Sequence, residues 1–363
     1  MNRIQKKCNP VEGVGWGQVP TVTFQIGPRY RSVLFEVIAT GAAGKIVTIN
    51  DVLGDVVFKV NGNPQRTHSA WQMDQINRSF GAQYAYNVYN HDAGVLHFTG
   101  GTGVPDGPVA AKETIFYITA FFREPWRDSY AVADMFCWPT SWPDGSVLSS
   151  FTCELTVPPI SINIVAGGTI QITCYTETDS MLGSVDAATK KPIMLINRWE
   201  RQNAVYGGSG LLVISTLPKK DILSQISFFS AYAVPGGGVY VGPIPGNTAA
   251  KTLTDQNDTA TPLFDAITSA KIEVDNVTIR DVSKAVSDTL LIDDNCNESA
   301  LPPDRLDVVF DKSDRPDDGL VLQAGGNTVK DFTVTLNVVA GAANASKFVT
   351  ILRQSFGPLA GGQ

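Results

Sequence analysis

Residues 57–62 read Val-Phe-Lys-Val-Asn-Gly, an alternating run that closes on a turn dipeptide. Alternation with a period of two predicts a strand with one buried face, and Asn-Gly is a strong signal for a hairpin turn. Residues 271–276 read Lys-Ile-Glu-Val-Asp-Asn and repeat this arrangement in the second half of the chain. An arginine follows each turn, Arg66 in the first half and Arg280 in the second, and a helical pattern comes next.

Two further short sequence similarities between the halves, called echoes below, occur in the same order. Residues 151–157 match residues 332–338 at Phe, Thr, Leu and Val without a gap. Residues 122–128 and 310–316 both begin with phenylalanine and are charged loops with a proline. Three ordered echoes predict that one β-sandwich fold has been duplicated, and two units are too few for a solenoid.

Strand patterns recur along the whole chain with turn residues between them, which is typical of a β-sandwich or jelly roll. The strand candidates are residues 21–26, 32–38, 55–60, 94–98, 114–119, 131–138, 146–157, 160–165, 169–174, 192–199, 211–215, 226–233, 270–280, 305–310, 332–339 and 348–356.

A short helix is predicted after the first hairpin. Ser69 and Gln72 have the spacing of a capping box, in which each side chain binds a free N–H group at the start of a helix. Met73, Ile76 and Phe80 then fall on one helical face, and Gly81 supplies a stop.

The prolines at positions 158 and 159 predict the domain boundary, because proline cannot donate to a strand ladder. We therefore expect an all-β double jelly roll, two tandem jelly-roll sandwiches with short helices in loops. The N-terminal arm would span residues 1–18, the first jelly roll residues 19–158 and the second residues 159–363.

Composition supports packed cores. Of the 363 residues, 43% are hydrophobic and 17% charged, which argues against disorder. The net charge of −7 argues against sequence-specific nucleic acid binding, which calls for a basic face. No apolar run reaches bilayer length and no signal-peptide core is present, so we expect a soluble protein made in a cytoplasm. The cysteines lack metal or CxxC spacing and are interpreted as buried free thiols: Cys8, Cys137, Cys153, Cys174 and Cys296.

No catalytic constellation is visible, so the sequence predicts neither an enzyme nor a cofactor. His68, His91 and His97 have no metal-ligand spacing, and no nucleophile elbow or HExxH motif occurs. The most acidic segment suggests a calcium site as an alternative to the favoured solvated turn. Its candidate ligands are Asp311, Asp314, Asp317 and Asp318.

Several segments resemble the corticovirus-type major capsid proteins of membrane-containing icosahedral bacteriophages. In the first half these are residues 21–30, 60–62, 73–81 and 123–127. In the second half they are residues 197–199, 217–219 and 304–320. The resemblance covers most of the chain, although its motifs are degenerate and this chain has longer loops at 179–191 and 236–262.

The resemblance implies a coat protein in which two jelly rolls stand side by side. It implies that three copies form a pseudo-hexagonal capsomer, which contacts neighbouring capsomers, penton proteins and minor capsid proteins in the virion. Synthesis is expected in the host cytoplasm. Since such shells enclose a bilayer, the basic residues Arg3, Lys6 and Lys7 are membrane-proximal candidates for a weak contact with anionic headgroups.

A β-sandwich glycan-binding or adhesion module is the alternative function. Exposed aromatic side chains would form its sugar platform, whereas core or inter-subunit packing of the same residues is favoured. The candidates are Trp126, Trp138, Trp142, Tyr84, Tyr86 and Tyr89.

Overall fold

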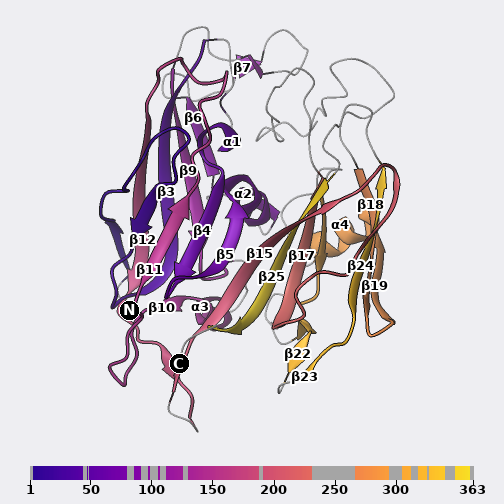
Figure 1. The fold of residues 1–363 in the computed structure, drawn as a ribbon. Coiled ribbons are helices and arrows are strands. Elements are labelled where there is room, and N and C mark those ends of the chain that lie inside the picture. The colour runs from indigo at the N-terminus through magenta and orange to yellow at the C-terminus, as the bar shows by residue number, and fades with distance from the viewer. Residues whose placement is uncertain are drawn as a thin grey trace. The chain divides into compact units, whose positions relative to one another are not determined.

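The computed structural model consists of two compact units, residues 1–198 with 358–363, and residues 199–357. Figure 1 traces both units from indigo at the N-terminus to yellow at the C-terminus. The structure describes residues 3–43, 47, 49–79, 86–90, 97–98, 105–106, 112–125, 130–187, 191–230, 266–293, 305–311, 318–324, 327–339 and 348–359.

The first unit is a jelly roll of two antiparallel sheets. One sheet has the order β1 (Ile4–Lys7), β12 (Ile170–Asp179), β3 (Arg29–Gly41), β9 (Lys112–Phe121) and β6 (Tyr86–Asn90), with β10 (Trp138–Pro139) on β3. The other has the order β2 (Thr21–Thr23), β11 (Phe151–Leu155), β4 (Asp55–Val60) and β5 (Asn63–Ser69).

The second unit repeats this plan. One sheet contains β15 (Leu195–Val205), β25 (Phe348–Pro358), β17 (Ile222–Ser230) and β20 (Arg305–Val309), with β21 (Leu320–Val321) on β17. The other contains β16 (Gly210–Ile214), β24 (Phe332–Val339), β18 (Ala266–Val274) and β19 (Val277–Ser283). In Figure 1, β18, β24 and β19 lie side by side in this unit.

The remaining described elements are short. They are the helices α1 (Ile49–Val52), α2 (Ala70–Ser79), α3 (Tyr130–Met135) and α4 (Lys284–Asp293), and the two-residue strands β7 (His97–Phe98), β8 (Pro105–Asp106), β13 (Ser184–Val185), β14 (Pro192–Ile193), β22 (Gln323–Ala324) and β23 (Asn327–Thr328). None of the helices in the described ranges has the length and hydrophobicity needed to cross a bilayer.

The observed division lies later than the boundary expected between residues 158 and 159. The prolines there do end the pairing of β11, but the first roll takes its last strand, β12, from beyond them. β12 pairs with β3 over its whole length, from Ile170 opposite Ala39 to Asp179 opposite Arg29. The expected arm over residues 1–18 is also partly strand, because β1 pairs with the other edge of β12.

Three strand predictions are wrong in detail. Residues 131–135 belong to helix α3 and only Trp138 is in a strand, β10, while residues 160–165 form a turn with one isolated bridge from Ile164 to Gly41. Apolar alternation over such short stretches does not separate a buried strand from a loop whose side chains enter the core. Residues 270–280 form a hairpin, with β18 and β19 on either side of a turn.

The predicted capping box is present at the start of α2. The backbone N–H of Gln72 donates to Ser69 Oγ at 3.1 Å, and the backbone N–H of Ser69 donates to Gln72 Oε1 at 2.9 Å. Met73 and Ile76 are buried on the same helical face as predicted. Phe80 and Gly81 lie outside the described residues.

The predicted duplication is visible residue by residue in the two hairpins. Phe151 lies opposite Val60 in the first roll, and Phe332 lies opposite Val274 in the second. Each hairpin has a register shift two residues before the end of its first strand, next to Phe58 and Ile272. These two residues lie opposite Arg66 and Arg280 respectively, so the echoes in the sequence mark equivalent positions in space.

The two turns are also built alike. Asn61 and Asp275 have positive φ values of 50° and 48°. The Oδ1 atom of Asn61 accepts the backbone N–H groups of Ser149 and Ser150, at 2.8 and 3.3 Å. The Oδ1 atom of Asp275 accepts those of Lys330 and Asp331, at 2.7 and 2.8 Å. Each side chain therefore ties its turn to the segment that leads into the neighbouring strand.

Replacing Asn61 or Asp275 with alanine should destabilise the corresponding roll by about 2 kcal/mol, because alanine loses these hydrogen bonds and tolerates positive φ poorly. Glycine at either position loses the side-chain hydrogen bonds but adopts positive φ without strain. It should therefore lower the free energy of unfolding by about half as much as alanine does. Urea denaturation of the four variants measures both effects. Equal stability of the alanine variants and the unchanged protein would contradict this role of the turns.

Candidate assembly site

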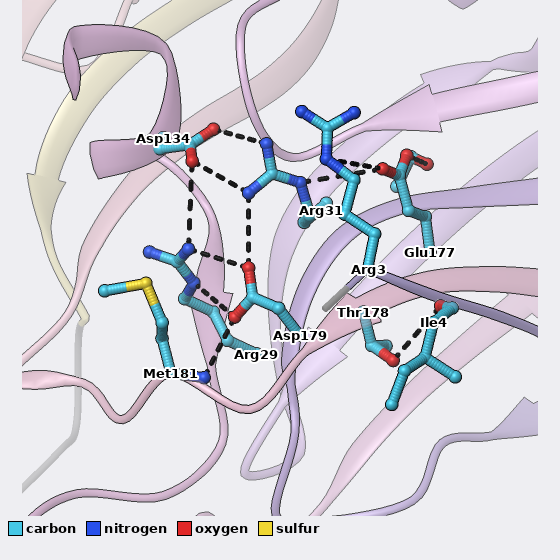
Figure 2. A network of polar contacts seen from close by, with 10 residues as sticks. Arg3, Ile4, Arg29, Arg31, Asp134, Glu177, Thr178, Asp179 and Met181 are labelled. Carbon is cyan, nitrogen blue, oxygen red and sulfur yellow. Dashed lines mark hydrogen bonds and ion pairs between the residues drawn. The ribbon is translucent and has the colours of Figure 1, made fainter. Parts of the chain in front are cut away.

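Two arginines and two aspartates form an ionic cluster at one end of the first roll, shown in Figure 2, and all of them except the half-buried Asp134 are buried. Arg29 and Arg31 lie on the same side of β3, Asp179 ends β12 and Asp134 lies on α3. Arg29 donates from Nε and Nη2 to the two Asp179 oxygens at 3.0 and 2.7 Å. Arg31 donates to both Asp134 oxygens at 2.8 and 2.6 Å, and to Asp179 Oδ2 at 3.2 Å.

Burial makes this cluster depend on complete pairing. Arg31 and Asp179 are each 1% exposed. Burial by itself raises the pKa of Asp179, but the bonds from Arg29, Met181 N–H and Arg31 outweigh it and hold the pKa below its usual value. Burial by itself lowers the pKa of Arg31, and its bonds to Asp134 and Asp179 raise it above its usual value. Arg31 and Asp179 therefore retain their charges at neutral pH.

The N-terminal strand is attached beside this cluster. Arg3 Nε lies 3.6 Å from Glu177 Oε1, an atom that is equally far from Arg31 Nε. Lys6 Nζ donates to Gln25 Oε1 at 2.6 Å, and Lys7 is exposed. The three basic residues thus belong to an edge strand and its entry, and two of them have partners on the protein. Their contact with a membrane stays a prediction.

Another buried arginine, Arg66, lies in the aromatic core of the first roll. Arg66 Cζ lies 5.2 Å from the ring centroid of Phe122 and 5.3 Å from that of Trp138. Its Nε donates to the Asn197 carbonyl at 2.9 Å, and its Nη1 donates to the Phe121 carbonyl. Burial lowers the pKa of Arg66 to about 9, and the charge of Glu124 opposes this shift.

The second roll repeats this contact at the equivalent positions. Arg280 Cζ lies 5.7 Å from the ring centroid of Phe310, the residue that matches Phe122 in the sequence echo. Arg280 is only half-buried. The sequence showed an arginine after each turn, but nothing in its spacing indicated that both stack on the echoed phenylalanines.

The calcium candidates are only partly described. Asp311 is buried, accepts a hydrogen bond from Ser224 Oγ at 2.8 Å, and lines a cavity of about 480 Å³ with Arg280 and Asp307. Asp318 is exposed, whereas Asp314 and Asp317 lie outside the described residues. Within the described ranges, no three His, Cys, Asp or Glu side chains gather as a metal site. A calcium site in this segment stays a prediction.

The tryptophans proposed for a sugar platform are buried where they are described. Trp138 stacks on Phe122 with ring centroids 4.3 Å apart, and Trp142 donates from Nε1 to the Ile193 carbonyl at 3.1 Å. Both therefore serve packing, the favoured interpretation. Trp126, Tyr84 and the side chains of Tyr86 and Tyr89 lie outside the described part of the chain.

An exposed apolar pair lies on the edge strand β16 of the second roll. Leu211 and Val213 are 74% and 63% exposed, while Leu212 and Ile214 face the core. Within the described residues no strand pairs with the outer edge of β16. Val213 corresponds to Thr21 in the first roll, where both backbone groups of Thr21 bond to Glu12, at 3.0 and 3.1 Å. Among the described residues, the edge that is covered in the first roll is thus open in the second.

Comparisons with solved structures agree with this fold. The major capsid protein P2 from bacteriophage PM2 matches with a TM-score of 0.63 and 11% identity, over 100% of both chains. The PBCV-1 virus capsid matches with a TM-score of 0.59 and 12% identity, over 99% of this chain and 95% of the other. A structure of Sulfolobus turreted icosahedral virus matches with a TM-score of 0.60 and 11% identity, over 98% of this chain and 91% of the other. No curated protein matches at a significant level.

The chain therefore has the double jelly-roll fold of these capsid proteins. More narrowly, residues 5–99 match the family described as the viral coat protein P2 N-terminal domain. The predicted resemblance to corticovirus-type major capsid proteins is thereby confirmed.

Proposed function

We propose that this chain forms the trimeric capsomers of an icosahedral shell that encloses a membrane. The observation that carries the proposal is the duplication. The hairpins around Asn61 and Asp275 have the same strand register, the same positive φ in the turn, and the same side-chain hydrogen bonds to the neighbouring segment. Two similar rolls in each chain let three copies supply six similar wedges, and a closed threefold ring needs only one kind of contact between copies.

In this proposal the capsomer contacts neighbouring capsomers, penton proteins and minor capsid proteins, and the chain is made in the host cytoplasm. Size-exclusion chromatography with light scattering tests self-association directly. We expect a particle with three times the mass of one chain. A stable monomer at the concentrations at which shells form would overturn the proposal.

The open edge of β16 is a candidate contact between copies. An edge strand offers unpaired N–H and C=O groups, and covering an exposed leucine and valine contributes roughly 1.5–3 kcal/mol each. Leu211→Asp with Val213→Asp should therefore weaken trimer formation by roughly tenfold or more. Val147→Asp, at another exposed valine in the first roll, is the matched control. If the double variant and the Val147→Asp control remain trimeric to the same dilution, this edge is not part of the interface.

A further inference from the structure

Two free cysteines face each other where the N-terminal strand joins the first roll. The register of β1 on β12 places Lys7 opposite Tyr175, so that the next residues, Cys8 and Cys174, are cross-strand neighbours. The backbone N–H of Cys8 donates to the Cys174 carbonyl at 2.8 Å, which continues the ladder through this pair. Residues opposite each other in antiparallel strands point to the same face of the sheet.

Their separation suits a covalent bond. Hydrogen-bonded pairs of antiparallel strands have Cα atoms about 5.5 Å apart, within the roughly 4.4–6.8 Å that a disulfide spans. The two side chains already contact each other through a thiol–thiol hydrogen bond. From this geometry we propose that Cys8 and Cys174 form an oxidative modification site, at which an intrachain disulfide fastens the N-terminal strand to the first roll.

The two sulfur atoms differ in a way that sets the order of the reaction. Cys8 is half-buried and Cys174 is buried, so a small oxidant reaches Cys8 first. The hydrogen bond from Cys174, together with the charge of Lys6, lowers the pKa of Cys8 although burial opposes this. The thiolate is the nucleophile in thiol–disulfide exchange, so the more exposed sulfur is also the more reactive one.

The oxidant in this reaction is a low-molecular-weight disulfide such as oxidised glutathione. The Cys8 thiolate attacks one of its sulfur atoms, the glutathione S–S bond breaks, and one glutathione thiol leaves. The sulfur of Cys174 then attacks Cys8 Sγ, and the second glutathione thiol leaves. Two cysteine thiols are oxidised, one disulfide is reduced, and the two protons end on the released glutathione.

The bond would reinforce a weakly held element. Among the described contacts, β1 is a four-residue edge strand whose residues are all exposed, and in the Arg3–Glu177 ion pair the arginine side chain is 52% exposed. A pair of this kind contributes little. The disulfide would close a long loop of the chain and so restrict the unfolded state.

The protein itself provides a clean test. After incubation with oxidised glutathione, free thiols are blocked with N-ethylmaleimide under denaturing conditions, and the chain is cleaved after glutamate. The peptide of residues 1–12 then has Cys8 as its single cysteine, and the peptide of residues 155–177 has Cys174 as its single cysteine. We expect non-reducing mass spectrometry to show these two peptides linked, with loss of two hydrogen atoms, and reduction to separate them.

Cys8→Ser and Cys174→Ser should each abolish the linked peptide, whereas Cys137→Ser, which removes another buried free thiol, should retain it. The oxidised protein should also melt at a higher temperature than the reduced protein, and Cys8→Ser should remove this difference. Recovery of both peptides in fully blocked form, or a link between two copies of residues 1–12, would overturn the proposal.

Discussion

Replacing Asp179 with alanine is expected to destabilise the first jelly roll by about 3–5 kcal/mol, because it removes one partner of a buried ionic cluster. Asp179 accepts from Arg29 at 2.7 and 3.0 Å and from Arg31 at 3.2 Å. In the variant, the nearest described anion to Arg29 is Asp134, 3.8 Å away. Urea denaturation followed by tryptophan fluorescence measures the loss.

The matched control is Asp144→Ala, since Asp144 is exposed and its side-chain hydrogen bonds in the described part of the chain are to its neighbour Ser146. Its effect should stay within about 0.5 kcal/mol. If Asp179→Ala and Asp144→Ala lower the free energy of unfolding equally, the cluster does not stabilise the roll.

The pH dependence of the same variant follows from the lowered pKa of Asp179. A carboxyl group whose pKa is lower in the folded state contributes stability that is fully present above its unfolded pKa of about 4. That stability is lost as the pH falls through the folded pKa. The difference between the unchanged protein and Asp179→Ala should therefore be constant near neutral pH and shrink below pH 4.

Replacing Arg66 with alanine should cost about 4 kcal/mol. The change leaves a large cavity beside Phe122 and Trp138, and it removes a donor to the Asn197 and Phe121 carbonyls. Arg66→Met refills part of the space and separates the packing loss from the hydrogen-bond loss. Urea denaturation of both variants gives the two contributions.

The second roll supplies the control for this prediction. Arg280→Ala removes the equivalent contact with Phe310, but Arg280 is half-buried, so the loss should be about 1 kcal/mol. An equal loss at both positions would show that burial does not govern the strength of this repeated contact.

The local features of the fold were predictable because their signals lie within a few residues. The Asn61 turn and the Ser69 capping box each depend on one short stretch of sequence. The duplication was also predictable, since strands at equivalent positions keep the same alternation, as Phe151 and Phe332 do at the start of β11 and β24.

The boundary and the buried clusters were not predictable for a physical reason. β12 joins the first roll by pairing with β3, which lies more than a hundred residues earlier, and no local signal encodes such pairing. The bonds from Arg29 and Arg31 to Asp179 span 150 and 148 residues. Cys8 and Cys174 are likewise brought together only by the register of β1, so that spacing alone gave two isolated thiols.

Electron microscopy of the purified protein tests the central claim most directly, since that claim is a duplicated roll that assembles in threes. We predict class averages with threefold symmetry and a nearly hexagonal outline, each formed by three chains that contribute two rolls apiece. Particles of the size of a single chain, or rings with a number of chains other than three, would contradict it.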